Sequence, residues 1–235
     1  MFSILTKITS VSIVTALMFA SSSTLAGGDK TYKVTITNLT NSITFTPILV
    51  ASHKKGLAPL FVLGEPASSD MTEIAEGGAI GSLAATLMAD PEVEDVNSTG
   101  MPPAGLLLPG ASVTVTVSAE KGAKHISIAS MMLPTNDGFI ALNGVKAPKK
   151  GSVTYYSPGY DAGTEINDED CANIPGPTCG GEGLSPDTDG EGYVHIHRGM
   201  HGIGDSTDPD VTFLAEDVYD WRNPVAKITI TRMKN

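Results

Sequence analysis

YKVTIT at residues 32–37 and AKITIT at residues 226–231 share one pattern, in which apolar side chains alternate with Lys or Thr. Successive side chains of a β-strand point to opposite faces of the sheet, so this alternation predicts strands with one buried and one exposed face. The two stretches lie near the two ends of the chain. The sequence therefore predicts one half-buried strand before, and one after, all the other expected strands and helices.

Six further segments have the alternation, or the β-branched and aromatic composition, that is typical of strands. They are residues 43–50, 113–117, 126–132, 138–142, 153–156 and 193–197. A chain with so many short strands buries their apolar faces most simply in two antiparallel sheets packed face to face. The expected fold class is all-β, mainly an antiparallel β-sandwich.

One segment, residues 69–90, departs from this pattern because its apolar residues recur nearer to helical spacing. Ser69 or Asp70 is the expected N-cap, and Glu73 stands in the capping-box position. Three glycines interrupt the segment. We therefore expect two short helices in a connection between strands.

The first 26 residues have the three-part form of a secretory signal peptide: Lys7, an apolar run from Ile8 to Ala20, and small residues ending at Ala26. The apolar run is too short to span a membrane, which needs about 20 apolar residues. We expect cleavage after Ala26, with an uncleaved anchor as the alternative. Residues 27–235 would then form a single secreted or periplasmic domain.

Charge limits the choice of partners. Residues 27–235 carry 14 basic and 26 acidic side chains, a formal charge of −12. A surface this acidic repels nucleic acid and anionic membranes, so we expect neither as a partner and no membrane insertion after cleavage. Acidic loops do suit hard cations such as calcium.

The only two cysteines, Cys171 and Cys179, lie in one short loop, CANIPGPTC. In an oxidising compartment such a pair is most simply a disulfide bond. A metal or redox pair is the competing interpretation. The spacing is not C-x-x-C and no His lies between the two residues, so we expect the disulfide.

Catalytic and nucleotide-binding signatures are absent from the sequence, including G-x-S-x-G, G-x-x-x-x-G-K-S/T and H-E-x-x-H. We therefore expect a protein that is not an enzyme. Asp187, Asp189 and Gly190 match three positions of an EF-hand loop, but Ser185 and Ile196 stand where that loop needs acidic ligands. A solvated turn is the better interpretation of those residues.

Two acidic points lie beside expected strand ends. Asn136 and Asp137 follow one strand, and Asp161 with Glu165 follows another. If these loops meet at one end of the sandwich, their oxygen atoms converge as calcium ligands. The alternative is that Asn136 and Asp137 form an Asx turn and that Asp161 caps the next loop.

Three of the five histidines are concentrated in VHIHRGMHG, as His195, His197 and His201. On a strand His195 and His197 share one face, and a turn at Gly199 would bring His201 back beside them. Three imidazoles placed in this way would ligate zinc or copper. Hydrogen bonding to neighbouring backbone, or plain solvent exposure, is the alternative.

The order of these segments resembles the spondin amino-terminal domain, in particular its bacterial secreted versions. The resemblance extends from about Tyr32 to Met233. It is carried by YKVTITNLTNSITFTPILVASH, LFVLGEPAS with IAEGG, MLPTNDGFIALNG, YYSPGYDAGTE and WRNPVAKITITRM. Its most specific parts are the P-x-x-D turn at residues 134–137 and the DAGT motif at residues 161–164.

The resemblance implies a C2-like β-sandwich with a bound calcium ion, as in secreted matrix and adhesion proteins of animals, and it favours calcium at Asp137 and Asp161. Two residues depart from the family pattern. Gly138 stands where an aromatic residue commonly follows the turn aspartate, and Glu165 stands where an aspartate commonly follows DAGT. The thrombospondin-type repeats of the animal proteins are missing, so adhesion to an animal-type receptor does not transfer.

Three hypotheses about function follow. The first is a secreted or periplasmic calcium-stabilised module that binds or adheres to an extracellular protein, a glycan or a surface. The second is a zinc- or copper-dependent enzyme, or a metal-handling protein, that uses the three histidines. The third is a structural envelope protein without a metal.

Overall fold

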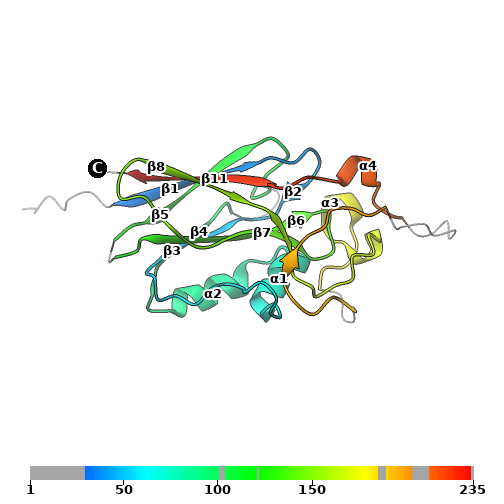
Figure 1. Cartoon of the computed structure of the whole chain (residues 1–235), viewed down its shortest axis with the longest axis horizontal. Coiled ribbons are helices and arrows are strands. Elements are labelled where there is room, and N and C mark those ends of the chain that lie inside the picture. Colours follow the sequence, from blue (N-terminus) through cyan, green and yellow to red (C-terminus); the bar gives the residue numbers. More distant parts are fainter. Residues whose placement is uncertain (1–29, 101–103, 121, 185–188, 203–211, 234–235) are drawn as a thin grey trace, which may run out of the picture.

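The computed structural model describes residues 30–100, 104–120, 122–184, 189–202 and 212–233 (Figure 1). The expected signal peptide lies outside the described residues. Ser185 and Asp187 of the partial EF-hand pattern also lie outside them.

The strands form two antiparallel sheets, which confirms the all-β sandwich (Figure 1). The first sheet has the order β5 (Ser112–Ser118), β1 (Thr31–Asn38), β11 (Ala226–Met233) and β8 (Ser152–Ser157). The second has the order β10 (His195–Ile196), β9 (Gly159–Asp161), β7 (Gly138–Lys146), β6 (His125–Leu133), β3 (Leu49–His53) and β4 (Val93–Ser98), and β2 (Thr44–Phe45) also pairs with β6.

The two stretches with matching alternation pair directly with each other. Residues of β1 and β11 lie opposite one another from Thr31 and Met233 to Asn38 and Ala226. The alternating apolar residues, Tyr32 to Ile36 in β1 and Ala226 to Ile230 in β11, point into the space between the sheets, where they are fully buried, while the Thr and Lys residues between them lie on the outer face. Each large side chain that is buried in this way contributes about 1.5–3 kcal/mol to folding.

Two helices cover the outer face of the second sheet and form a third layer (Figure 1). They are α1 (Ser69–Gly77) and α2 (Gly81–Ala89), as the sequence predicts. The expected cap was wrong, because Ser68 is the N-cap and its hydroxyl accepts a hydrogen bond from the Met71 N–H. Glu73 makes no capping box; it accepts a hydrogen bond from Ser82 instead.

Several strand boundaries differ from the expectation. Residues 43–50 form parts of two strands, β2 and β3, because Pro47 between them has no N–H to donate to a ladder. Only His195–Ile196 of the expected strand 193–197 is in a ladder. The acidic strand β4 and the three-residue strand β9 were not expected at all.

The remaining elements are short: a 3₁₀ turn η1 (Cys171–Asn173), α3 (Gly176–Cys179) and α4 (Glu216–Tyr219). A disulfide bond joins Cys171 to Cys179, with Cα atoms 4.7 Å apart, which confirms that prediction. It closes a loop around Ile174, which is fully buried in the core between the sheets. Among the described residues, no helix has the length and apolarity needed to cross a membrane.

Candidate metal centre

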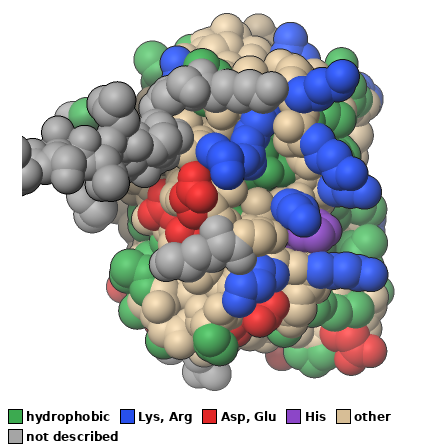
Figure 2. Space-filling view, turned by 90° about the vertical axis from the view of Figure 1, so that its left-hand side faces the viewer, with side chains coloured by type: hydrophobic (Ala, Val, Ile, Leu, Met, Phe, Trp, Pro, Cys, Tyr) green, Lys and Arg blue, Asp and Glu red, His purple; other side chains and the backbone are tan. Residues whose placement is uncertain are grey.

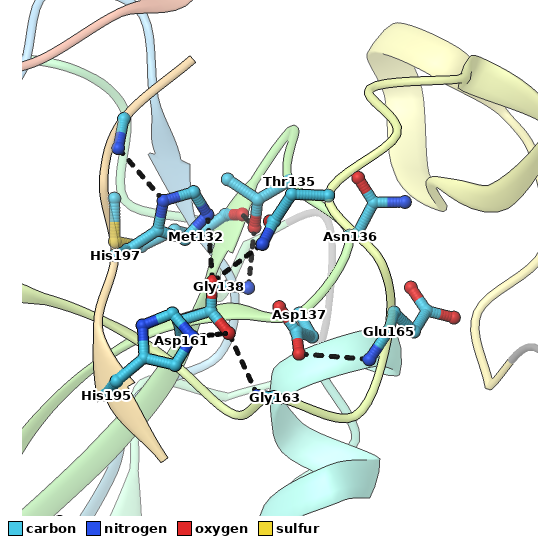
Figure 3. A network of polar contacts seen from close by, with 12 residues as sticks. Met132, Thr135, Asn136, Asp137, Gly138, Asp161, Gly163, Glu165, His195 and His197 are labelled. Atoms are coloured by element: carbon cyan, nitrogen blue, oxygen red, sulfur yellow. Dashed lines mark hydrogen bonds and ion pairs between the residues drawn. The ribbon is translucent and has the colours of Figure 1, made fainter. Parts of the chain in front are cut away.

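Three strands bring acidic and histidine side chains together at one end of the second sheet. Asp137 immediately precedes β7, Asp161 ends β9 and His195 begins β10. Asp161 lies directly opposite Gly138 on one side and His195 on the other. Because residues that are directly opposite in an antiparallel ladder have side chains on the same face, the Asp161 and His195 side chains meet. Figure 3 shows the resulting cluster.

Asp137 is fully buried, and only one of its two carboxylate oxygens is hydrogen bonded. Oδ2 accepts hydrogen bonds from the backbone N–H groups of Thr164 (2.8 Å) and Glu165 (3.2 Å). Oδ1 is buried without a hydrogen-bond partner among the described residues. Burial, together with the neighbouring charge of Asp161, raises the pKa of Asp137 to about 8. The folded protein thus has a carboxylate that lacks a compensating positive charge.

Asp161 is also fully buried. Its Oδ1 accepts a hydrogen bond from the Gly163 N–H at 2.9 Å, and its Oδ2 accepts one from the Asn167 amide at 2.8 Å. Burial raises the pKa of Asp161, although the Asn167 amide and His195 oppose this shift. Both oxygens retain a second lone pair with which to bind a cation or an imidazolium.

The other two residues expected as calcium ligands lie differently. The Asn136 amide donates to Asp168 (2.8 Å), and its oxygen accepts from the Glu169 N–H (3.2 Å). Glu165 contributes its backbone N–H to Asp137, while its carboxylate points away from Asp161 (Figure 3). In this arrangement Asp137 and Asp161 are the side chains that face a common position.

His195 has the orientation of a metal ligand. Its Nδ1 lies 3.0 Å from the Ile196 carbonyl oxygen, so Nδ1 carries the proton and Nε2 has a free lone pair in the neutral ring. Nε2 lies 3.3 Å from Asp161 Oδ1 and 3.5 Å from Glu191 Oε2. Burial opposes protonation, but the Ile196 carbonyl and the two carboxylates raise the pKa of His195.

His197 shares the face of His195, as the sequence predicts, and both rings point toward Asp161 (Figure 3). Its Nδ1 accepts a hydrogen bond from the Gly199 N–H at 3.1 Å, so Nε2 carries the proton of the neutral ring. That proton points at Asp161 Oδ2, 3.9 Å from Nε2. Burial lowers the pKa of His197 to about 3, and a ring in this tautomer offers no lone pair toward the cluster.

His201 lies against a different carboxylate. Gly199 has a positive φ of 96°, and beyond it Glu169 accepts hydrogen bonds from the backbone N–H groups of His201 and Gly202. The His201 Nδ1 lies 3.7 Å from Glu169 Oε1. The structure therefore places the third histidine beside Glu169 and not in a three-imidazole ligand set.

A different trio gathers its ligand atoms within 4.8 Å of one another: Asp161, Glu191 and His195. It is the one such group of Asp, Glu, His and Cys side chains found in the part of the chain that the structure describes. Sequence reasoning missed Glu191 because it lies in a Gly-rich acidic loop without periodicity. Its spacing of four residues from His195 was the available signal.

The DAGT motif has its glycine because the backbone packs tightly here. Gly163 has a φ of +67°, and a Cβ at this position would lie 2.3 Å from the Tyr193 carbonyl oxygen. Its own carbonyl accepts a hydrogen bond from the Gly192 N–H at 2.8 Å. Only glycine allows this approach, which brings the loop after β9 against the segment that leads to β10.

Comparison with protein-family models gives a match to the family described as Spondin_N over residues 30–166. The matched region contains Asn136, Asp137, Asp161 and Glu165, and it ends before the disulfide, Glu191 and the three clustered histidines. No curated protein sequence matches the chain.

Proposed function

The chain belongs to the spondin N-terminal domain family, and from this premise we propose that it is a calcium-stabilised extracellular module that binds or adheres to a protein, a glycan or a surface. The family is a non-catalytic, extracellular type of β-sandwich domain. To this family assignment our proposal adds that the chain binds calcium, that it is secreted and that it has a protein, glycan or surface as its ligand.

The observation that supports calcium is the state of Asp137. A fully buried carboxylate with one oxygen that lacks a partner, next to a second buried carboxylate, requires either a proton or a cation. Both side chains offer the oxygen ligands that calcium prefers. Asp137 and Asp161 would hold the ion, with backbone carbonyl groups and water as the remaining ligands, and the ion would neutralise their mutual repulsion.

A second candidate function is binding of zinc or copper by Asp161, Glu191 and His195. The ring orientation of His195 favours it, because the Nδ1 contact with the Ile196 carbonyl directs the Nε2 lone pair at the two carboxylates. Three protein ligands leave one position of a tetrahedral zinc site open, as in catalytic sites. This trio replaces the three histidines in the hypothesis of a metal-dependent enzyme or metal-handling protein.

Metal analysis of the protein purified without added metal distinguishes the two candidates. One equivalent of calcium, without zinc or copper, is the result expected for the binding module. Stoichiometric zinc or copper that is lost in a His195→Ala variant would support the second candidate instead. Protein that contains no metal and binds no calcium in a subsequent titration would contradict the calcium proposal.

A further inference from the structure

Positive side chains gather at the end of the sandwich that is opposite Asp137 (Figure 2). Lys124, Lys146, Lys149 and Arg232, which we call the basic end, line a hollow of about 160 Å³. A second hollow of about 210 Å³ is lined by His53, Lys55 and His125 among others. Within the described part of the chain, no Asp or Glu side chain lines either hollow. This distribution is unexpected for a chain whose formal charge is −11.

The strand registers explain why these residues meet. His53, His125 and Lys146 lie opposite one another across β3, β6 and β7. In the other sheet Tyr32 lies opposite Arg232. Lys146 ends the same strand, β7, that begins beside Asp137, and a strand of this length places the two charges roughly 25 Å apart. Strand pairing therefore gathers cations from both sheets at one end of the sandwich, where acidic side chains such as Glu120 also lie.

The side chains of the basic end are held in place by local contacts. The Arg232 guanidinium lies over the Tyr32 ring, 4.8 Å from its centroid. The Tyr32 hydroxyl donates to the Ala123 carbonyl oxygen. Among the described residues, none of the four cations of the basic end forms an ion pair, whereas the nearby Lys54 pairs with Glu92 at 3.5 Å.

The neighbouring lysines act on His125. Its pKa is lowered by burial first and then by the positive charges of Lys146, Lys55 and Lys124. Repulsion among like charges that are held in place is relieved when an anion binds between them. An arginine held against an aromatic ring also loses little freedom when it binds a carboxylate, sulfate or phosphate group.

We propose that the basic end binds an acidic polysaccharide, one charged group of which lies in the hollow among the four cations. The adjacent hollow beside His125 lies in line for the next sugar of an extended chain. The acidic remainder of the surface disfavours a membrane or a nucleic acid duplex, since both present negative charge beyond the patch. The proposal names the ligand class of the binding function proposed above, and it does not depend on calcium.

The test measures binding of oligogalacturonate and of neutral dextran oligosaccharides of equal length by calorimetry. Wild-type protein is expected to bind the acidic sugar alone, with an affinity that falls as salt is raised. Lys146→Gln/Lys149→Gln should weaken binding about tenfold. The control, Arg222→Gln/Lys227→Gln, also removes two positive charges, at the start of β11 and in the segment just before it, and should change binding less than about twofold.

Equal losses in the two double variants would overturn the assignment to the basic end. Absence of oligogalacturonate binding at low salt would overturn the acidic glycan as ligand, and so would equally tight binding of anionic lipid vesicles or duplex DNA. Asp137→Asn separates the two proposals, because it should abolish a calcium response and leave oligogalacturonate binding intact. If the wild-type protein responds to calcium but does not bind oligogalacturonate, this inference is contradicted and the calcium proposal is not.

Discussion

The Nε2 atom of His195 lies 3.3 Å from Oδ1 of Asp161, directly across the ladder that joins β9 and β10. One buried carboxylate thus faces a histidine on one side and a second carboxylate, Asp137, on the other. Asp161 would be a ligand both in the calcium proposal and in the transition-metal alternative. Asp137 would be a ligand for calcium only, and His195 for zinc or copper only, so variants of these two residues distinguish the proposals.

Zinc or copper binding, if present, should depend on His195 and Glu191 but not on Asp137. His195→Ala should lower zinc affinity at least a hundredfold, because it removes the only nitrogen ligand of the trio. Calorimetric titration of zinc into the His195→Ala and Asp137→Asn variants measures this difference. Wild-type affinity in His195→Ala would exclude the trio.

From the raised pKa of Asp137 we predict that the calcium-free protein loses stability as pH rises. Its pKa is about 8 when folded and 3.8 in an unperturbed chain, so between these values the folded state binds more protons than the unfolded state. The free energy of unfolding should therefore fall with increasing pH, by at most about 1.4 kcal/mol per unit for one proton. Asp161 and Glu165 add to this repulsion.

Urea denaturation in chelator at several values between pH 6.5 and 8 checks this slope. Asp137→Asn should reduce it, and calcium should abolish it in the wild type. The raised pKa of His195 gives a residual slope of the same sign. A slope that is identical in the wild type and in Asp137→Asn would contradict the assigned proton.

From the lowered pKa of His197 we predict a loss of stability as pH falls. Its pKa is lowered from 6.5 to about 3 by burial, so the unfolded chain binds the proton first as pH falls. Its contribution to stability is complete above pH 6.5 and is lost between pH 6.5 and 3. In His197→Asn, whose Oδ1 can accept the Gly199 N–H, thermal melts should show a weaker loss over this range. An unchanged acid limb would place the titrating group elsewhere.

The close approach at Gly163 predicts a large effect of a single methyl group. Gly163→Ala should destabilise the fold by about 2–4 kcal/mol, because a Cβ would lie 2.3 Å from a backbone oxygen that cannot rotate away. Gly192→Ala is the matched control, since Gly192 has φ +81° with nothing within 4 Å of a Cβ. It should cost only about 1 kcal/mol of backbone strain. Similar costs for both variants would argue against the packing.

The alternation of apolar and polar residues was sufficient to predict those strands that have one buried and one exposed face. β1 and β11 were evident because Val34 and Ile228 alternate with Thr and Lys over a full strand. β4 was missed because it lies at a sheet edge and its sequence, VEDVNS, has no fully buried residue. β9 has only three residues, too few for a period to be seen.

The candidate site was predictable in part for a similar reason. Asp137 and Asp161 were predicted because they lie beside expected strand ends and in the family motifs. The alternation of side chains along a strand correctly predicted that His195 and His197 share one face. The partners of these residues depend on tertiary contacts. Asp161 and His195 are 34 residues apart and meet only through the β9–β10 ladder, and Glu169 competes for the backbone around His201.

Thermal melting with calcium or with chelator tests the calcium proposal most directly. At free calcium a hundred times its dissociation constant, binding to the folded state adds about 2.7 kcal/mol to stability. Wild-type protein should melt at a higher temperature in calcium, Asp137→Asn and Asp161→Asn should lose most of this shift, and Asp217→Asn, exposed on α4, should retain it. Identical melting temperatures of the wild type in calcium and in chelator, or loss of the shift in Asp217→Asn alone, would contradict the account.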